Sequence, residues 1–193
     1  MLRLSGSMGT MLALAKESIM EIEHKARLYM AYHEAGHAVV SELLGLPIDH
    51  IRLADKGHLF TSQIAPIRLV ASECVPVNLQ RNPTAQEFVN FICAELGGLV
   101  AEGVFFGKAS ESGLNDRSSM IELMAGQMEE ADIDYLSGPL WGIIRDQHHS
   151  ITEIATKLIA TGFVSGRNIR LILSTTGSKP PLGSVHMITF EGE

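Results

Sequence analysis

The sequence predicts an α+β fold that is mainly helical and carries a small β-sheet. Most apolar residues recur at the three- and four-residue spacing of amphipathic helices, whereas one segment near residue 60 alternates with period two. The chain has 193 residues, of which 46% are hydrophobic, and this suffices for one buried core. We expect the domain to cover residues 16–175, with an N-terminal segment at 1–15 and a C-terminal tail at 176–193.

A long helix is expected first. Apolar residues recur at helical spacing from about Glu17 to Leu44, and Gly45 with Pro47 ends the run. The pattern fits one continuous helix, or two helices with a break near Ala31.

A hairpin or three-stranded sheet is expected next, over residues 48–70. This stretch alternates between apolar and polar residues and has a turn signal at residues 55–57. Residues 71–83 are expected to form a loop.

Further helices are expected in the second half of the chain. Thr84 and Glu87 have the spacing of a capping box, which predicts a second helix that runs to Val104. A third helix is expected over 115–131 and a fourth over 140–160, where a glycine follows.

The composition narrows the classes of partner. A net charge of −7 argues against a nucleic-acid-binding surface, which needs clustered lysine and arginine. Cys74 and Cys93 lack the spacing of a thiolate metal site, so they predict buried thiols in a reducing compartment, and we expect a cytoplasmic protein. No run of 18 or more uncharged apolar residues occurs, so no membrane-spanning helix is expected.

The run YMAYHEAGHAVV at residues 29–40 contains the candidate metal-binding and catalytic residues. His33 and His37 are four residues apart, so in a helix both imidazoles point from one face toward a single cation. Glu34 is rotated by about 100° from His33, which suits a general base better than a ligand. Gly36 inside a helix costs about 1 kcal/mol, which indicates that another segment approaches closely there. These residues predict a zinc site with a base beside it.

A catalytic zinc ion needs a third protein ligand. Five residues are candidates by type and position, and each also has an ordinary explanation as a paired carboxylate, a helix N-terminal charge or a solvated face. Spacing alone does not choose among them. The candidates are Glu95, Glu102, Asp116, His148 and His149.

Three motifs in order resemble the peptidase domain of the FtsH family of ATP-dependent zinc metalloproteases. They are AYHEAGHAVV, LGGLVAEGVFFG at 96–107 and SGLND at 112–116. The resemblance covers about residues 28–175 and implies a helical zincin-type domain with HExxH on a long helix. It also implies zinc as cofactor, with His33, His37 and Asp116 as ligands and Glu34 as catalytic base.

The resemblance makes two weaker assignments. Glu102 matches the glutamate of the family's LGG motif and is expected to hold the metal ligands in place without binding the metal itself, or to have a structural role. The family binds extended substrate along a strand, which here falls around Leu59 to Pro66 and includes Leu59, Phe60, Thr61 and Ser62.

The sequence also departs from the family pattern. Leu99 replaces the usual arginine of LGGR, and neither a GxxxxGK[ST] phosphate loop nor the family's membrane helices occur in these 193 residues. We therefore expect a zinc endopeptidase that cleaves unfolded or flexible protein segments without its own ATPase, or with a separate ATPase as partner. Family members form hexameric rings together with their ATPase, so a homo-oligomer, a smaller assembly and a monomer all stay open. The main alternative is a non-catalytic, zinc-stabilised binding or adaptor module, and a weaker one is a helical protein without metal.

Overall fold

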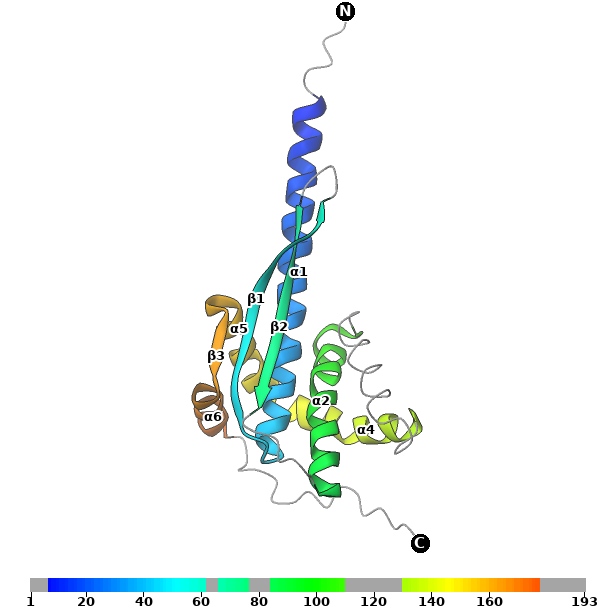
Figure 1. Ribbon diagram of the computed structural model, residues 1–193, viewed down its shortest axis with the longest axis vertical. Coiled ribbons are helices and arrows are strands. Elements are labelled where there is room, and N and C mark those ends of the chain that lie inside the picture. Colours follow the sequence, from blue (N-terminus) through cyan, green and yellow to red (C-terminus); the bar gives the residue numbers. More distant parts are fainter. Residues whose placement is uncertain (1–6, 62–65, 77–83, 110–129, 178–193) are drawn as a thin grey trace, which may run out of the picture.

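The computed structural model describes residues 7–61, 66–76, 84–109 and 130–177. Within these ranges the chain is mostly helical and has a small antiparallel sheet, which confirms the predicted fold class. In chain order the elements are α1 (Ser7–Leu43), β1 (Ile48–Thr61), β2 (Pro66–Pro76), α2 (Ala85–Phe106), α4 (Glu130–Asp146), α5 (His148–Thr161), β3 (Phe163–Ser165) and α6 (Gly166–Thr175) (Figure 1).

Helix α1 is the long axis around which the other elements pack (Figure 1). It begins at Ser7, earlier than the predicted start near Glu17, and passes through Ala31 without a break. Its N-terminal half projects from the body, where Met20 and Ile22 are 68% and 57% exposed. From Ala31 onward the helix is buried, so its C-terminal half belongs to the core.

The hairpin of β1 and β2 is longer than the sequence pattern predicted. The predicted turn at residues 55–57 is wrong, because β1 continues through it and Lys56 pairs with Leu69 of β2. The register shifts between Lys56 and His58, so Gly57 marks a bulge rather than a turn. The predicted loop at 71–83 is also partly wrong, because residues up to Pro76 belong to β2; residues 77–83 lie outside the described ranges.

The third strand of the sheet comes from the far end of the sequence. The strand order is β2-β1-β3, and β3 pairs antiparallel with the start of β1 through Ile51 and Val164. The sequence pattern did not predict this three-residue strand. Its pairing ties the C-terminal elements α5 and α6 to the sheet.

Helix α2 begins with the predicted capping box. The Thr84 hydroxyl accepts a hydrogen bond from the Glu87 N–H, and the Glu87 carboxylate accepts one from the Thr84 N–H at 2.7 Å. These hydrogen bonds from Thr84 lower the pKa of Glu87. The helix ends at Phe106 rather than at the predicted Val104, and Gly107 follows with a φ of 74°.

By length and composition alone, residues Gln86–Phe106 of α2 could also span a membrane. Core helices of globular proteins pass the same test. In this fold α2 packs against α1 and α4.

The predicted helix over 140–160 is two helices. α4 and α5 meet at Gln147, whose backbone angles are not helical. The start of α4 includes Ala131, where the predicted third helix ends, and residues 115–129 of that prediction lie outside the described ranges. The hydrophobic core lies between the C-terminal half of α1, the sheet and the helices, and its large fully buried side chains include Ile51, Leu96, Leu140, Ile151 and Leu158.

Candidate metal centre

The two histidines and the glutamate of the HEAGH run lie in the buried half of α1. His33, Glu34 and His37 are only 3%, 5% and 7% exposed. Helix α2 and strand β2 both pack against α1. Polar side chains buried to this extent destabilise a fold unless they are hydrogen-bonded or bind a ligand. The run is therefore not a solvated helix face that happens to carry histidines.

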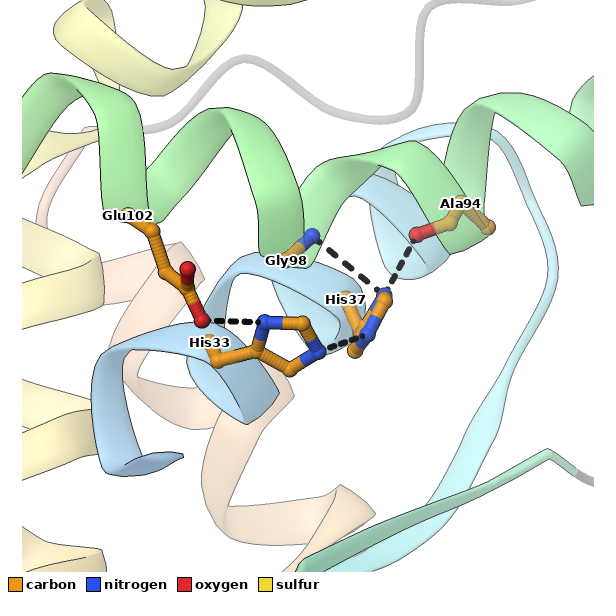
Figure 2. A network of polar contacts seen from close by, with 5 residues as sticks. All are labelled: His33, His37, Ala94, Gly98 and Glu102. Carbon is orange, nitrogen blue, oxygen red and sulfur yellow. Dashed lines mark hydrogen bonds and ion pairs between the residues drawn. The ribbon is translucent and has the colours of Figure 1, made fainter. Parts of the chain in front are cut away.

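The ring contacts indicate which nitrogen of each histidine carries the proton (Figure 2). His33 Nδ1 lies 2.9 Å from Glu102 Oε1, and His37 Nδ1 lies 2.9 Å from the carbonyl oxygen of Ala94. Ionised carboxylate and carbonyl oxygens only accept hydrogen bonds, so both Nδ1 atoms donate. The Gly98 N–H also lies 3.3 Å from His37 Nδ1. An Nδ1 that donates to the Ala94 carbonyl has no lone pair for this N–H, and we assign the proton by the shorter contact, which is the one to Ala94.

Both Nε2 atoms then carry lone pairs, and they face each other across 2.8 Å (Figure 2). Two lone pairs at this distance repel each other unless a cation or a shared proton lies with them. Two imidazoles on one tetrahedral zinc ion place their nitrogens about 3.3 Å apart, so a small movement of the rings opens the pair enough. The outer nitrogen of each ring is oriented by an oxygen acceptor, as in zinc sites generally. The two Nε2 atoms are therefore suited to be two of the ligands of a zinc ion.

Glu34 is a second sign of function beside the pair. Its Oε2 atom is fully buried and has no hydrogen-bond partner among the described residues. A carboxylate oxygen buried without a partner is costly in a fold. Buried carboxylates of this kind cluster at functional sites, where they take part in reactions, for example by accepting a proton.

Glycines bring α2 against the histidine-bearing side of α1. A Cβ at Gly36 would lie 2.5 Å from the carbonyl oxygen of Gly97, so the predicted close approach at Gly36 is confirmed. A Cβ at Gly98 would lie 2.5 Å from His37 Nε2 and 2.7 Å from His33 Nε2. Only glycine can pack this closely against both Nε2 atoms. Gly97 and Gly98 are the LGG pair of the sequence motif.

The structure does not bring a third ligand to the pair within its described ranges. No group of three or more histidine, cysteine, aspartate or glutamate side chains that could hold a metal ion occurs there. Glu102 contacts the outer nitrogen of His33 rather than its Nε2 side. His148 and His149 are exposed at the start of α5, where the His148 ring stacks on Phe105. Asp116 lies outside the described residues.

The expected substrate strand lies at the far end of β1. Phe60 pairs with Ile67 and Thr61 with Pro66, so these residues form the distal part of the hairpin. Ser62 lies outside the described residues. The role of residues 59–62 therefore stays a prediction.

Cys74 of β2 lies beside the centre. Burial raises the pKa of its thiol well above the ordinary value, and the nearby carboxylates of Glu34, Glu95 and Glu42 raise it further. Burial alone raises the pKa of Cys93 to about 11. Both are free thiols, and Cys74 is half-buried rather than fully enclosed.

Sequence reasoning missed three contributors to the centre. The carbonyl of Ala94 left no signal, because a backbone oxygen does not depend on residue type. Gly98 left one, since two adjacent glycines inside a helix indicate a close approach. The place of Cys74 depends on the length of β2, which the pattern underestimated.

Comparison with known proteins identifies the same region. A family model described as peptidase family M41 matches residues 20–131, which is more than half of the chain. The chain is 32% identical over 124 residues to the ATP-dependent zinc metalloprotease FtsH of Thermotoga maritima, covering 63% of this chain and 19% of that protein. It is 29% identical over 116 residues to the ATP-dependent zinc metalloprotease FtsH of Methylococcus capsulatus, covering 58% of this chain and 16% of that protein.

The chain thus spans less than a fifth of the length of these two relatives. The matched part contains α2 and the HEAGH half of α1, which together form the histidine pair and its supports. The chain belongs to peptidase family M41.

Proposed function

We propose that this chain is a zinc-dependent endopeptidase that hydrolyses peptide bonds in unfolded or flexible protein segments. The observation that carries the proposal is the pair of Nε2 atoms 2.8 Å apart, with the buried Glu34 next in sequence to His33, whose Oε2 has no hydrogen-bond partner among the described residues. A structural zinc site would have no need of that carboxylate and would normally fill all four metal positions with protein ligands.

In this proposal His33 and His37 bind zinc through Nε2, and Asp116 is the third ligand. The assignment of Asp116 rests on the resemblance of SGLND to the family motif. Zinc supplies a Lewis acid that acidifies water and polarises the scissile carbonyl. Gly98 packs directly against both imidazoles, and because it has no Cβ, its side-chain position does not crowd the two Nε2 atoms.

Glu34 acts as the general base. Its unpartnered Oε2 is ready to accept a proton from the attacking water and to deliver it to the leaving amine nitrogen. Burial within the domain limits the bulk water that would otherwise compete for this oxygen. The same side chain therefore first takes up the proton and then releases it.

Glu102 holds His33 in place rather than touching substrate. Replacing Glu102 with glutamine is expected to lower zinc affinity about 10- to 100-fold, because a neutral amide is a weaker acceptor for the His33 Nδ1–H. Zinc affinity is measured by competition with a chromogenic chelator. Glutamine at Glu153, an exposed carboxylate on α5, removes the same charge away from the site and should leave zinc affinity unchanged. Unchanged affinity in Glu102→Gln would contradict the role of Glu102.

The protein substrate, the partners and the compartment belong to the proposal as well. The relatives are named ATP-dependent, and we propose that an ATPase delivers folded substrates to this site, whereas flexible segments enter unaided. The free thiols of Cys74 and Cys93 suit a reducing compartment such as the cytoplasm.

The proposal is tested on the purified chain by metal analysis and by cleavage of labelled casein. We expect about one zinc ion per chain, cleavage that a chelator abolishes, and recovery when zinc is added back. A zinc-loaded chain that cleaves neither casein nor a library of unstructured peptides would refute the endopeptidase. That result would instead favour the non-catalytic, zinc-stabilised module.

A further inference from the structure

Glu95 is a carboxylate near the metal centre that the proposed reaction does not use. It lies one helical turn before Gly98 and two before Glu102, so the three residues share one face of α2. Gly98 lies against both Nε2 atoms, and Glu102 binds His33. Glu95 therefore lies on the face of α2 that meets the histidine pair, on the opposite side of Gly98 from Glu102.

The charge of Glu95 is not neutralised by the described part of the chain. Glu95 is half-buried, and no ion pair or hydrogen bond to its carboxylate occurs among the described residues. Glu42, by contrast, accepts hydrogen bonds from Arg170 Nη1 at 2.7 Å and from the Ile48 N–H at 2.9 Å. Within the described part of the chain, Glu42 is thus paired and Glu95 is not.

Cys74 connects Glu95 to the catalytic side of the centre. Its thiol on β2 lies within electrostatic reach of Glu34 on α1 and of Glu95 on α2. The thiol is neutral at physiological pH, so it cannot balance either carboxylate. The Oε2 atom of Glu34 is fully buried and has no partner in the part of the chain that the structure describes. α1, α2 and β2 thus bring two unpaired carboxylates to one neutral thiol beside the histidine pair.

Zinc does not remove this excess of negative charge. With the proposed ligands, the two positive charges of a bound zinc ion would be balanced by the carboxylates of Asp116 and Glu34. In this count the negative charge of Glu95 is left unbalanced. A half-buried carboxylate attracts a cation more strongly than one in bulk water does, because the local dielectric constant is lower.

We propose that Glu95 gives the site a preference for substrates with a lysine or arginine side chain close to the scissile bond. The inference rests on the proposed peptidase function and names a substrate class for it. Glu95 acts here as a specificity-determining residue, which contacts the basic side chain and takes no part in proton transfer.

The test uses internally quenched peptides that differ at one position. Lysine is compared with norleucine, which is nearly isosteric and uncharged, at each of the positions flanking the cleaved bond. The wild type is expected to show a higher kcat/KM for lysine at one of these positions. Glu95→Gln is expected to lower the lysine-to-norleucine ratio about tenfold, and the wild-type preference should fall as salt is added. Glu153→Gln is the matched control and should keep the wild-type ratio.

Two further measurements keep the inference separate from the proposed function. Zinc content is determined for Glu95→Gln, because loss of zinc would show that Glu95 is a metal ligand and would overturn the inference. Binding of the same peptides to zinc-loaded Glu34→Gln protein is followed by fluorescence anisotropy. If the wild type cleaves no peptide, the peptidase proposal fails. Glu95 is then judged by binding alone, and equal affinity for the lysine and norleucine peptides overturns its role.

Discussion

Replacing Glu34 with glutamine is expected to lower kcat for peptide cleavage about 10²- to 10⁴-fold. Glutamine has nearly the same size as glutamate but cannot accept the proton at Oε2, the atom that is fully buried and has no partner in the described ranges. Zinc content and KM should stay near the wild-type values, because His33 and His37 are unchanged. The measurements are steady-state kinetics on a quenched peptide and metal analysis of the same preparations.

The expected loss of activity is distinguished from a loss of structure by stability. The substitution removes a buried negative charge, so Glu34→Gln should unfold at a temperature no lower than the wild type does. Glu21→Gln serves as the control on the same helix, since Glu21 is exposed on the projecting half of α1. A Glu34→Gln protein that cleaves peptides at the wild-type rate would rule out Glu34 as the base.

The helical part of the fold could be predicted because its signals are local. The apolar period in α1 and the capping box of Thr84 and Glu87 each involve residues within a turn or two of one another. Signals of this kind survive in a single sequence. The same holds for HEAGH, whose four-residue spacing within one helix placed both histidines on one side.

The sheet was predicted less well because its pairing is not local. Gly57 looks like a turn residue, yet strand pairing on both sides of it turns it into a bulge in β1. Val164 reaches Ile51 across more than a hundred residues of sequence, and no local pattern in a three-residue strand announces this. Because β2 was cut short by the false turn and loop, the position of Cys74 beside Glu34 and Glu95 could not be foreseen.

The candidate metal centre likewise combines features with a local sequence signal and features without one. His33, His37 and Glu34 were predicted from one helix, whereas the acceptors that orient the rings come from α2. One of these acceptors is the backbone carbonyl of Ala94, which no residue type encodes. Which nitrogen of each ring is left free for the proposed metal therefore depends on the crossing of two helices, and that crossing depends on glycine.

Replacing Gly98 with alanine is expected to abolish zinc binding and to lower peptidase activity by at least about 100-fold. The added methyl group would lie 2.5 Å from His37 Nε2 and 2.7 Å from His33 Nε2, which is shorter than any ordinary contact. Relief requires that α2 move away from α1 or that the imidazoles turn. The close contact between Gly97 and Gly36 prevents α2 from moving toward α1 but not away from it. The two helices therefore separate, and the hydrogen bond between His33 and Glu102 lengthens.

Helix propensity alone would predict the opposite result, since alanine stabilises a helix interior over glycine by about 0.5–1 kcal/mol. Gly142→Ala on α4 is the control that isolates this effect, because a Cβ there meets no atom of the described residues within 4 Å. We expect Gly142→Ala to keep zinc and activity and to unfold at an equal or higher temperature. Zinc titration, peptide cleavage and thermal unfolding are compared for both variants. If Gly98→Ala binds zinc as tightly as Gly142→Ala does, zinc binding does not depend on the packing of α2 against His33 and His37, and the proposed centre must be placed elsewhere.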